Sequence, residues 1–390
     1  MRRRIAGIFS WLARVWSIVG LALIAFVLLE GAYRAVRLVR NTGGGEPAVA
    51  VVPSIHPHAG DAWFAGWYEQ SIIRGGMVFD PYRANRRAPG HAPGVTIDSS
   101  GRRVTVQADG TGAVGRRLFL LGGSTMWGYT ARDSATIPSL VAAKLRARGV
   151  AGVEVVNLAQ PGYNATQEVA TLLLALRDGE IPAAAVFLTT HKDIYAAYQN
   201  GRPGGITSEG VYAALFEDRP PDAADEFRAL ARRSALGARW ISPSATTGSS
   251  VATPAMATPT AAICTGVAKQ YRELARLADA MGREYGFPVF FLRQPMLAST
   301  KKPLSAWEGT LARPRHEALY RQCMATIDST MRGLTSPAYQ SLASLFDADS
   351  ASVFLDEYGY LTERAGGTIA TRIVDLVAPT LLRGRRAAPR

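Results

Sequence analysis

The chain has 390 residues, of which 48% are hydrophobic and 19% are charged, with a formal net charge of +13. That is an ordinary globular composition with an apolar segment added, for one large or two smaller domains. Residues 1–40 carry +6 and residues 383–390 carry +4, which leaves only +3 for everything between. Because the basic character belongs to the two ends, we exclude a nucleic-acid-binding core.

The N-terminal region contains one long apolar run, residues 16–33, with Arg residues before and after it. A run of about 18 residues is long enough to cross a bilayer as a helix. A cleavable signal peptide is the alternative, but no convincing small-x-small cleavage site is evident. We expect residues 1–40 to be a single-pass anchor in the inner (cytoplasmic) membrane. The Arg residues ahead of the run favour a cytoplasmic N-terminus, which places the main domain in the periplasm or outside the cell.

Residues 41–115 are expected to be a linker and a small lead-in region that packs against the main domain. Residues 41–45 are polar and rich in glycine, as linkers are. Residues 95–97 and 104–106 alternate like two short strands around a turn at 98–101.

From residue 116 onwards, strand and helix patterns alternate. Short apolar runs predict strands at 117–121, 153–157, 184–189 and 287–292, with a shorter one near 343–347. Apolar periodicity predicts helices at 137–148, 165–177, 265–285, 312–333 and 362–382. This alternation indicates an α/β fold with a parallel sheet covered on both faces. We expect residues 116–382 to form that domain, with a flexible low-complexity loop at 243–262 and a basic tail at 383–390.

The chain has two cysteines, Cys264 and Cys323, which lie in or near predicted helices. Outside the cytoplasm they are free to form a disulfide, and two buried free thiols are the alternative. The five histidines are scattered, and no Cys/His pair has the spacing of metal ligands. We therefore expect neither a metal site nor a cofactor.

The most informative stretch is 118–128, where four apolar residues run directly into Gly122-Gly123-Ser124. Two glycines allow a sharp turn at the carboxyl end of a strand, where open α/β sheets bind ligands. Ser124, between a strand end and a helix, is a candidate nucleophile. The alternative is a glycine-rich turn whose serine only satisfies backbone groups.

Three further predicted strand ends carry polar motifs. Residues 157–164 read Asn-Leu-Ala-Gln-Pro-Gly-Tyr-Asn, and the N–H of Gly162 is a candidate oxyanion donor beside Ser124. The third strand ends in Thr-Thr-His-Lys-Asp at 189–193. The last motif, Asp-Glu-Tyr-Gly-Tyr-Leu-Thr at 356–362, comes just before the final predicted helix.

In this order and with these strand contexts, the four blocks resemble the SGNH/GDSL hydrolase family over residues 115–380. The stretches at 294–295 and 302–305 are similar to its membrane-anchored or secreted bacterial branch. The resemblance implies a flavodoxin-like three-layer α/β/α fold and the hydrolysis or transfer of esters, often acetyl groups on glycans. It also implies that Ser124 is the nucleophile, Gly162 the second oxyanion donor and Asp356 the acid that orients a histidine base.

Two positions depart from the family pattern. Lys192 stands where the family has an Asn, and Tyr360 stands where it has the histidine base; the stricter spacing points to Gly359 instead. A tyrosine has an ordinary pKa of about 10, so it does not accept the serine proton at pH 7. Lys192 can replace the Asn as an oxyanion donor, or act as the base if burial depresses its pKa.

None of the five histidines is a convincing replacement base. We expect His191 to face away from the site if Lys192 faces it, because successive side chains at a strand end point in opposite directions. The remaining four lie in the lead-in region or in a polar, solvated helical stretch: His56, His58, His91 and His316.

Three polar or aromatic residues beside the strand ends, Tyr163, Asn164 and Tyr195, are candidates for lining a sugar-binding cleft, with core or loop packing as the alternative. We therefore expect an envelope protein that is catalytically impaired and binds or scaffolds an acylated glycan or another envelope component. The alternative is an active serine esterase or O-acyltransferase, such as a deacetylase, that uses Ser124 with a base other than histidine. The expected partners are the membrane and a glycan or acyl-ester ligand, and the sequence names no protein partner.

Overall fold

The computed structural model describes residues 2–42, 54–61, 63–67, 76–107, 115–213, 260–311, 317–336, 338–357 and 359–383. The chain divides into two compact units, one of residues 1–49 with 213–252 and one of residues 50–212 with 253–390. The tail beyond residue 383 lies outside the described residues.

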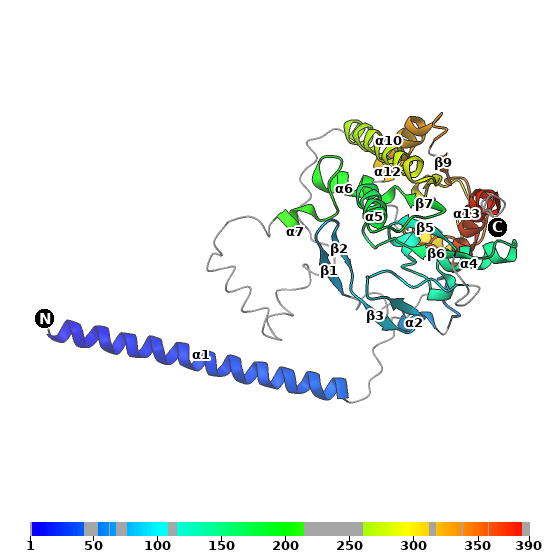
Figure 1. The fold of residues 1–390 in the computed structure, drawn as a ribbon. Coiled ribbons are helices and arrows are strands. Elements are labelled where there is room, and N and C mark those ends of the chain that lie inside the picture. The colour runs from blue at the N-terminus through cyan, green and yellow to red at the C-terminus, as the bar shows by residue number, and fades with distance from the viewer. Residues whose placement is uncertain are drawn as a thin grey trace. The chain divides into compact units, whose positions relative to one another are not determined.

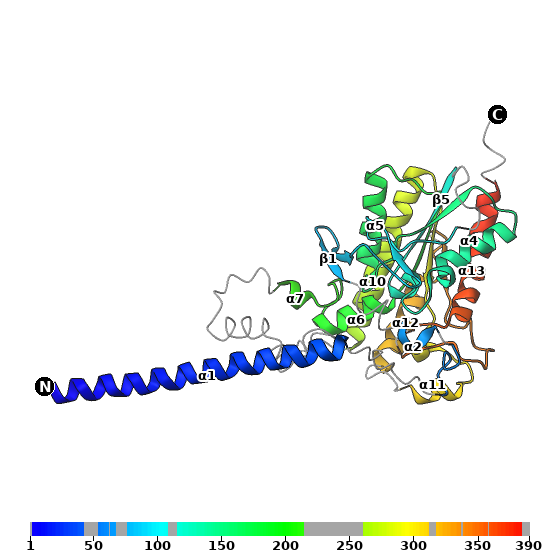
Figure 2. The same cartoon turned by 90° about the horizontal axis from the view of Figure 1, so that it is seen from below.

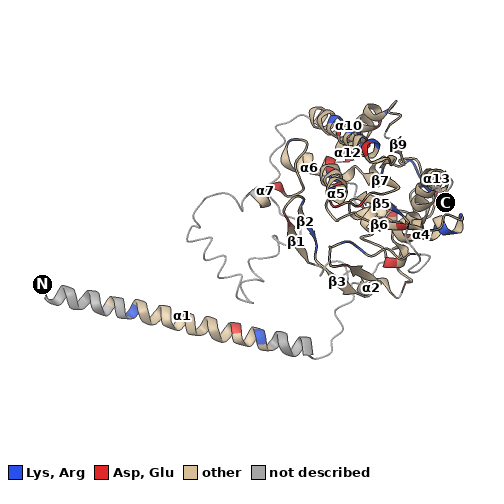
Figure 3. Cartoon of the chain, in the orientation of Figure 1, with Lys and Arg blue, Asp and Glu red and all other residues tan. Residues whose placement is uncertain are grey.

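A single long helix, α1 (Arg2–Thr42), belongs to the first unit. Residues 14–35 within it have a mean hydropathy of 2.2, and none of the apolar window is buried in protein. The charged residues of the coloured part of α1 lie toward its two ends (Figure 3). Near the C-terminal end, Glu30 pairs with Arg34 at 2.8 Å. By length and composition this segment fits a membrane anchor or a signal sequence.

The second unit is built on a five-stranded parallel sheet. Its strands, in spatial order, are β6 (Val153–Asn157), β5 (Arg116–Gly122), β7 (Ala184–Thr189), β8 (Val289–Arg293) and β9 (Ala338–Ser341). In chain order this is 2-1-3-4-5, the flavodoxin-like arrangement. The order reverses between β5 and its neighbours, so the crevice at their carboxyl ends is where such sheets bind ligands.

Helices cover both faces of this sheet (Figure 2). The helices α4 (Ile137–Ala147) and α13 (Glu363–Arg383) lie on one side, and α5 (Ala165–Arg177) and α10 (Thr260–Tyr285) lie on the other. On the second side α12 (Glu317–Met331) packs against α10. Although α13 is long and apolar enough to cross a membrane, half of it is buried in the domain.

The alternation of β5 explains why there are two apolar layers. Leu118 and Leu120 belong to the core under α4 and α13, whereas Phe119 and Leu121 belong to the core under α5, α10 and α12. All four side chains are fully buried. Since neighbouring strand side chains point to opposite faces, a continuous apolar run is what a sheet covered on both faces requires.

Short elements complete the second unit (Figure 1): α2 (Phe64–Trp67), α3 (Ser124–Trp127), α6 (His191–Asn200), α7 (Glu209–Ala213), α11 (Ala306–Thr310) and 3-10 turns at Asp133–Ala135 and Leu297–Ser299. The start of α4 follows helix-capping rules. The Thr136 hydroxyl accepts the N–H of Ser139, and Pro138 occupies the first turn as its fixed φ favours.

The lead-in region forms two small antiparallel pairs, β1 (Met77–Asp80) with β2 (Ala84–Arg87) and β3 (Gly90–Ala92) with β4 (Val95–Ile97). The predicted strand at 95–97 is present. The predicted return around the turn at 98–101 is present only as one antiparallel bridge, Ile97 with Arg103, and a hydrogen bond of 2.9 Å from the N–H of Val104 to the carbonyl oxygen of Thr96, so 104–106 do not form a strand. Residues 95–97 pair with the segment before them, and the chain then turns toward α4, where the N–H of Val106 donates to the Ser139 hydroxyl at 3.0 Å. The region contacts the main sheet directly, since Gln160 after β6 donates to the carbonyl oxygen of Gly101 at 2.6 Å.

Cys264 and Cys323 form a disulfide that joins α10 to α12. Both residues are buried, at 1% and 0% exposure. The structure therefore decides between the two alternatives that the sequence leaves open, in favour of the disulfide.

Two expected boundaries are wrong. The last strand, β9, lies at Ala338–Ser341 and not near 343–347, where the chain forms turns that bury Leu342 and Phe346. As an edge strand bonded only to β8, β9 is partly exposed and carries no apolar run. The predicted loop at 243–262 lies outside the described residues except for 260–262, which are the first helical residues of α10.

Candidate functional site

The turn that carries Ser124 is held tightly against the neighbouring strand. A Cβ added at Gly122 would lie 2.6 Å from the carbonyl oxygen of Leu188 in β7, so only glycine fits at the end of β5. Ser124 begins α3, and its carbonyl oxygen accepts the N–H groups of Gly128 and Tyr129 at 3.0 Å each. The residue is 8% exposed, and within the described residues its hydroxyl has no hydrogen bond to another side chain.

The loop that follows β6 lies against this turn. The N–H of Gln160 donates to the carbonyl oxygen of Gly122 at 3.1 Å, and a Cβ on Gly123 would lie 3.3 Å from the carbonyl oxygen of Tyr163. Gly162 has a φ of +89°, a backbone conformation that favours glycine. The sequence-predicted oxyanion donor therefore stands in a loop that contacts the serine turn.

Tyr163 and Asn164, two of the candidate cleft residues, are packing and capping groups. Tyr163 is 1% exposed and donates its hydroxyl to the carbonyl oxygen of Asn85 at 2.6 Å. The Asn164 side chain caps α5 in a reciprocal box with Gln167 and donates to the carbonyl oxygen of Gly205 at 2.9 Å. The packing alternative is correct for both.

Lys192 lies in the first turn of α6. The preceding Thr190 has a φ of +130°, a strained conformation for a β-branched residue. The Lys192 ammonium lies 4.8 Å from the centre of the Tyr195 ring. Burial lowers the pKa of Lys192, and the nearby Asp356 carboxylate acts against that by raising it. The electrostatic partner of Lys192 is therefore Asp356.

The loop that carries Asp356 and Tyr360 is closed by its own backbone. Phe354 bridges Leu361, and the N–H of Tyr360 donates to a carboxylate oxygen of Asp356 at 2.8 Å. The loop lies beside the serine turn, where the Thr125 hydroxyl is 3.5 Å from the carbonyl oxygen of Gly359. Gly359, the position that the stricter spacing assigns to the base, has a φ of +97° and no side chain to offer.

Tyr360 packs on an aromatic neighbour that sequence reasoning missed. Its ring stacks on Tyr129, with 5.2 Å between ring centres and an 18° angle between planes. Burial raises the pKa of Tyr129, and Arg87, the last residue of β2, acts in the opposite direction. The only sequence signal for Tyr129 is its place five residues after Ser124, in the helix–turn that the serine begins.

The described histidines have other roles. His191 stacks on Tyr320 of α12 with 5.3 Å between ring centres, and burial holds its pKa well below the usual value. His91 contacts the Thr96 hydroxyl at 3.0 Å. His56 and His58 stack on Phe64 near α2. His316 lies outside the described residues, so its expected role is untested.

The described residues thus include a serine at a helix start, Lys192 with Asp356 as a charged neighbour, and a stacked tyrosine pair. A serine hydroxyl is a weak nucleophile unless an adjacent base takes its proton. Tyr360, at the position of the base, is a phenol that stacks on another phenol. The described site therefore offers a hydroxyl, an ammonium and aromatic surface.

No protein-family model matches this chain, and no curated protein matches it. Among solved structures, it is similar to a member of the lipolytic protein G-D-S-L family from Veillonella parvula DSM 2008, with a TM-score of 0.38 and 11% identity, covering 67% of this chain and 97% of that one. A putative lipolytic protein of the G-D-S-L family from Desulfitobacterium hafniense DCB-2 is similar with a TM-score of 0.36 and 8% identity. The match covers 67% of this chain and 99% of that one. The esterase EstA from Pseudoalteromonas sp. is similar with a TM-score of 0.35 and 9% identity. The match covers 68% of this chain and 98% of that one.

Proposed function

We propose that this chain is a membrane-anchored SGNH-hydrolase-like protein of the cell envelope that binds an acylated glycan or another acyl-ester component without hydrolysing it. The observation that carries the proposal is that Tyr360, and not a histidine, stands at the position of the catalytic base. Tyr360 stacks on Tyr129, and the carboxylate of Asp356, the acid that would orient a histidine, acts on Lys192 by raising its pKa. Losing one member of a triad typically removes several orders of magnitude of rate.

A rescue experiment tests this reading of the site. We expect the wild-type chain to hydrolyse p-nitrophenyl acetate no faster than its Ser124→Ala variant. The double variant Lys192→Asn/Tyr360→His restores the base and frees Asp356 to orient it, so esterase activity should rise by at least about tenfold. A matched control, Tyr360→Phe with Lys192→Asn, keeps the stacking ring without a base and should stay inactive. Wild-type turnover that disappears in Ser124→Ala would contradict the proposal.

One observation favours a second candidate, an esterase or O-acyltransferase in which Lys192 is the base. Burial lowers the pKa of Lys192, and a lysine with a depressed pKa can accept a serine proton. This candidate requires that activity rise with pH as Lys192 loses its proton, and that Lys192→Met abolish it. The Asp356 carboxylate argues against it, because a nearby negative charge keeps the ammonium protonated.

The same proposal includes the placement of the domain outside the cytoplasm, held by residues 16–33. The disulfide between Cys264 and Cys323 supports this, because disulfides persist in oxidising compartments and are rare in the cytoplasm. Alkaline phosphatase fused after Arg390 should therefore be active in bacterial cells, and green fluorescent protein at the same point should be dark. The opposite pair of results would place the domain in the cytoplasm.

A further inference from the structure

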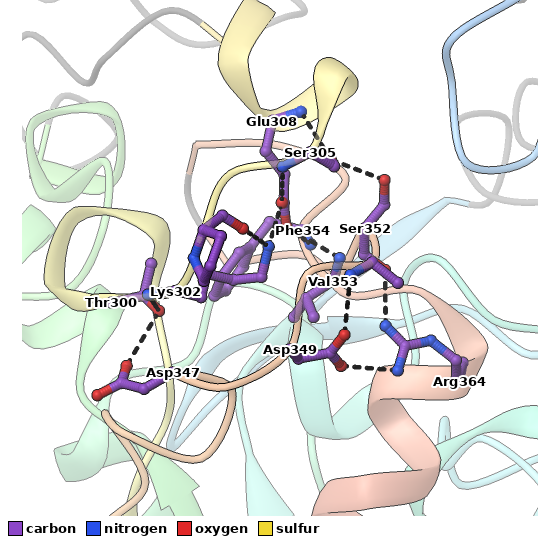
Figure 4. Close-up of polar contacts among 12 residues, drawn as sticks. Thr300, Lys302, Ser305, Glu308, Asp347, Asp349, Ser352, Val353, Phe354 and Arg364 are labelled. Carbon is purple, nitrogen blue, oxygen red and sulfur yellow. Dashed lines mark hydrogen bonds and ion pairs between the residues drawn. The ribbon is translucent and has the colours of Figure 1, made fainter.

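A buried ion pair lies beside Val353 and Phe354, which come shortly before Asp356 in the chain (Figure 4). Lys302 and Glu308 contact each other with both side chains 0% exposed. Glu308 and Ser305 form a capping box at the start of α11. The backbone N–H of Glu308 donates to the Ser305 hydroxyl at 3.2 Å, and the Glu308 carboxylate accepts the N–H of Ser305 at 3.0 Å. Capping glutamates normally face water, so complete burial of this one calls for a further role.

The second carboxylate oxygen of Glu308 bonds to another segment of the chain, residues 353–354. It accepts the N–H of Val353 at 2.9 Å and the N–H of Phe354 at 3.0 Å. The Ser305 and Ser352 hydroxyls meet at 2.8 Å and join the same two segments. Figure 4 shows the carboxylate between the start of α11 and this second segment.

The charge of this carboxylate is maintained inside the protein. Burial alone raises the pKa of Glu308, but Lys302 and the N–H groups of Ser305, Val353 and Phe354 lower it below its usual value. Lys302 is in turn satisfied by the carboxylate and by the carbonyl oxygen of Pro303 at 2.8 Å. An ionised, fully hydrogen-bonded carboxylate forms strong bonds to the two N–H groups.

The segment that Glu308 holds leads directly into the site. Phe354 is two residues before Asp356, and it also forms the bridge to Leu361 that closes the loop. The N–H of Leu355 donates to the carbonyl oxygen of Tyr360 at 2.8 Å. We propose that Glu308 is a positioning residue of the candidate site: by fixing residues 353–354 it sets the place of Asp356 beside Lys192.

The proposal rests on Asp356 and Lys192 belonging to the proposed site, but not on whether Ser124 is reactive. Its readout is therefore the titration of Lys192, which is independent of turnover. The chain has only five lysines, so reductive methylation with ¹³C-formaldehyde gives few methyl signals, and a Lys192→Arg variant assigns the one from Lys192. Methylation keeps the charge of the amine.

In the full-length chain in detergent, Asp356→Asn should lower the titration midpoint of Lys192 by about one unit or more, because an opposite charge is lost. Glu308→Gln should shift it in the same direction. The matched control is Asp328→Asn. Asp328 accepts two hydrogen bonds of 2.8 Å each from Arg293, so this variant also neutralises a carboxylate that is paired with a buried cation. These bonds involve neither the start of α11 nor residues 352–354. The control should lower the melting temperature and leave the Lys192 midpoint unchanged.

If Glu308→Gln does not fold, Ser305→Ala takes its place, because it removes only the hydroxyl that bonds the Glu308 N–H and Ser352. It should give a smaller downward shift of the same midpoint. An unchanged midpoint in the folded Glu308 or Ser305 variant, alongside a lowered one in Asp356→Asn, overturns the proposal. An equal shift in Asp328→Asn also overturns it, because the effect would then be general loosening.

Discussion

Replacing Arg103 by methionine should lower the free energy of unfolding by about 3–5 kcal/mol, because it removes one partner of a buried ion pair. The Arg103 side chain is 0% exposed, donates to Asp133 at 2.9 Å and lies 4.6 Å from the centre of the Trp127 ring. It also donates to the carbonyl oxygens of Gly94, Gly128 and Ala131. The methionine variant removes the Arg103 donor from every one of these acceptors, and within the described residues only the carbonyl oxygens of Gly94 and Gly128 keep a backbone N–H donor.

The neighbouring residue provides the control for this measurement. Arg102 pairs with Glu180 at 2.9 Å, but both side chains are about one-third exposed. Arg102→Met should therefore lower the free energy of unfolding by at most about 1 kcal/mol, which is what a surface ion pair contributes. Thermal and chemical unfolding of the full-length chain in detergent compares the two. Equal effects would show that the Arg103 contacts contribute no more than a surface pair.

The second large effect is a loss of stability at alkaline pH that depends on Glu168. Glu168 on α5 is 1% exposed and lies near Asp193 on α6, which accepts the N–H of Ala165 at 3.1 Å and contacts the Thr189 hydroxyl. Burial raises the pKa of Asp193 to about 7, and burial together with the charge of Asp193 raises that of Glu168 well above normal. Tyr271 on α10 is a further titratable group close to both carboxyls, and burial raises its pKa as well.

The sign follows from linkage. Asp193 binds its proton more tightly in the folded state, so its stabilisation is complete below the unfolded-state pKa of about 4 and disappears as the pH rises through about 7. The raised pKa of Glu168 acts with the same sign. Glu168→Gln mimics the protonated acid and removes the repulsion with Asp193. At pH 8 the variant should be more stable than the wild type by on the order of 2 kcal/mol, and at pH 4 the advantage should vanish.

The pH dependence of stability must be compared between the wild type and Glu168→Gln, because other carboxyls change the stability of both chains in the opposite direction. Hydrogen bonds and ion pairs outweigh burial and lower the pKa of Asp80 and Glu308, so their stabilisation is lost as the pH falls. Subtracting the wild-type curve from the Glu168→Gln curve cancels these terms. A difference that does not change between pH 4 and pH 8 would exclude proton binding by this pair.

The central part of the fold could be predicted from sequence because its signals are local. β5 is a continuous apolar run stopped by glycines, and the observed strand, Arg116–Gly122, exceeds the predicted one by one residue at each end. The edge strand β9 could not be found in this way. It is bonded to one neighbour and is partly exposed, whereas the apolar residues just after it are buried in turns.

The residues of the candidate site could be named from the sequence, but their contacts could not. Ser124, Lys192 and Tyr360 could be named from strand ends and a family pattern. The stacking of Tyr360 on Tyr129 joins residues more than 200 positions apart, which no local pattern reports. Glu308 did leave a signal, the Ser-x-x-Glu capping box at 305–308, but its burial and its second set of bonds depend on the tertiary fold.

The most direct test of the account is whether Ser124 is an activated nucleophile in the wild-type chain. A fluorophosphonate probe reacts with serines whose proton is taken by a neighbouring base. With full-length protein at pH 7, the absence of a described base contact predicts no labelling above that of Ser124→Ala. Strong labelling that Ser124→Ala abolishes would contradict the account and establish an active enzyme.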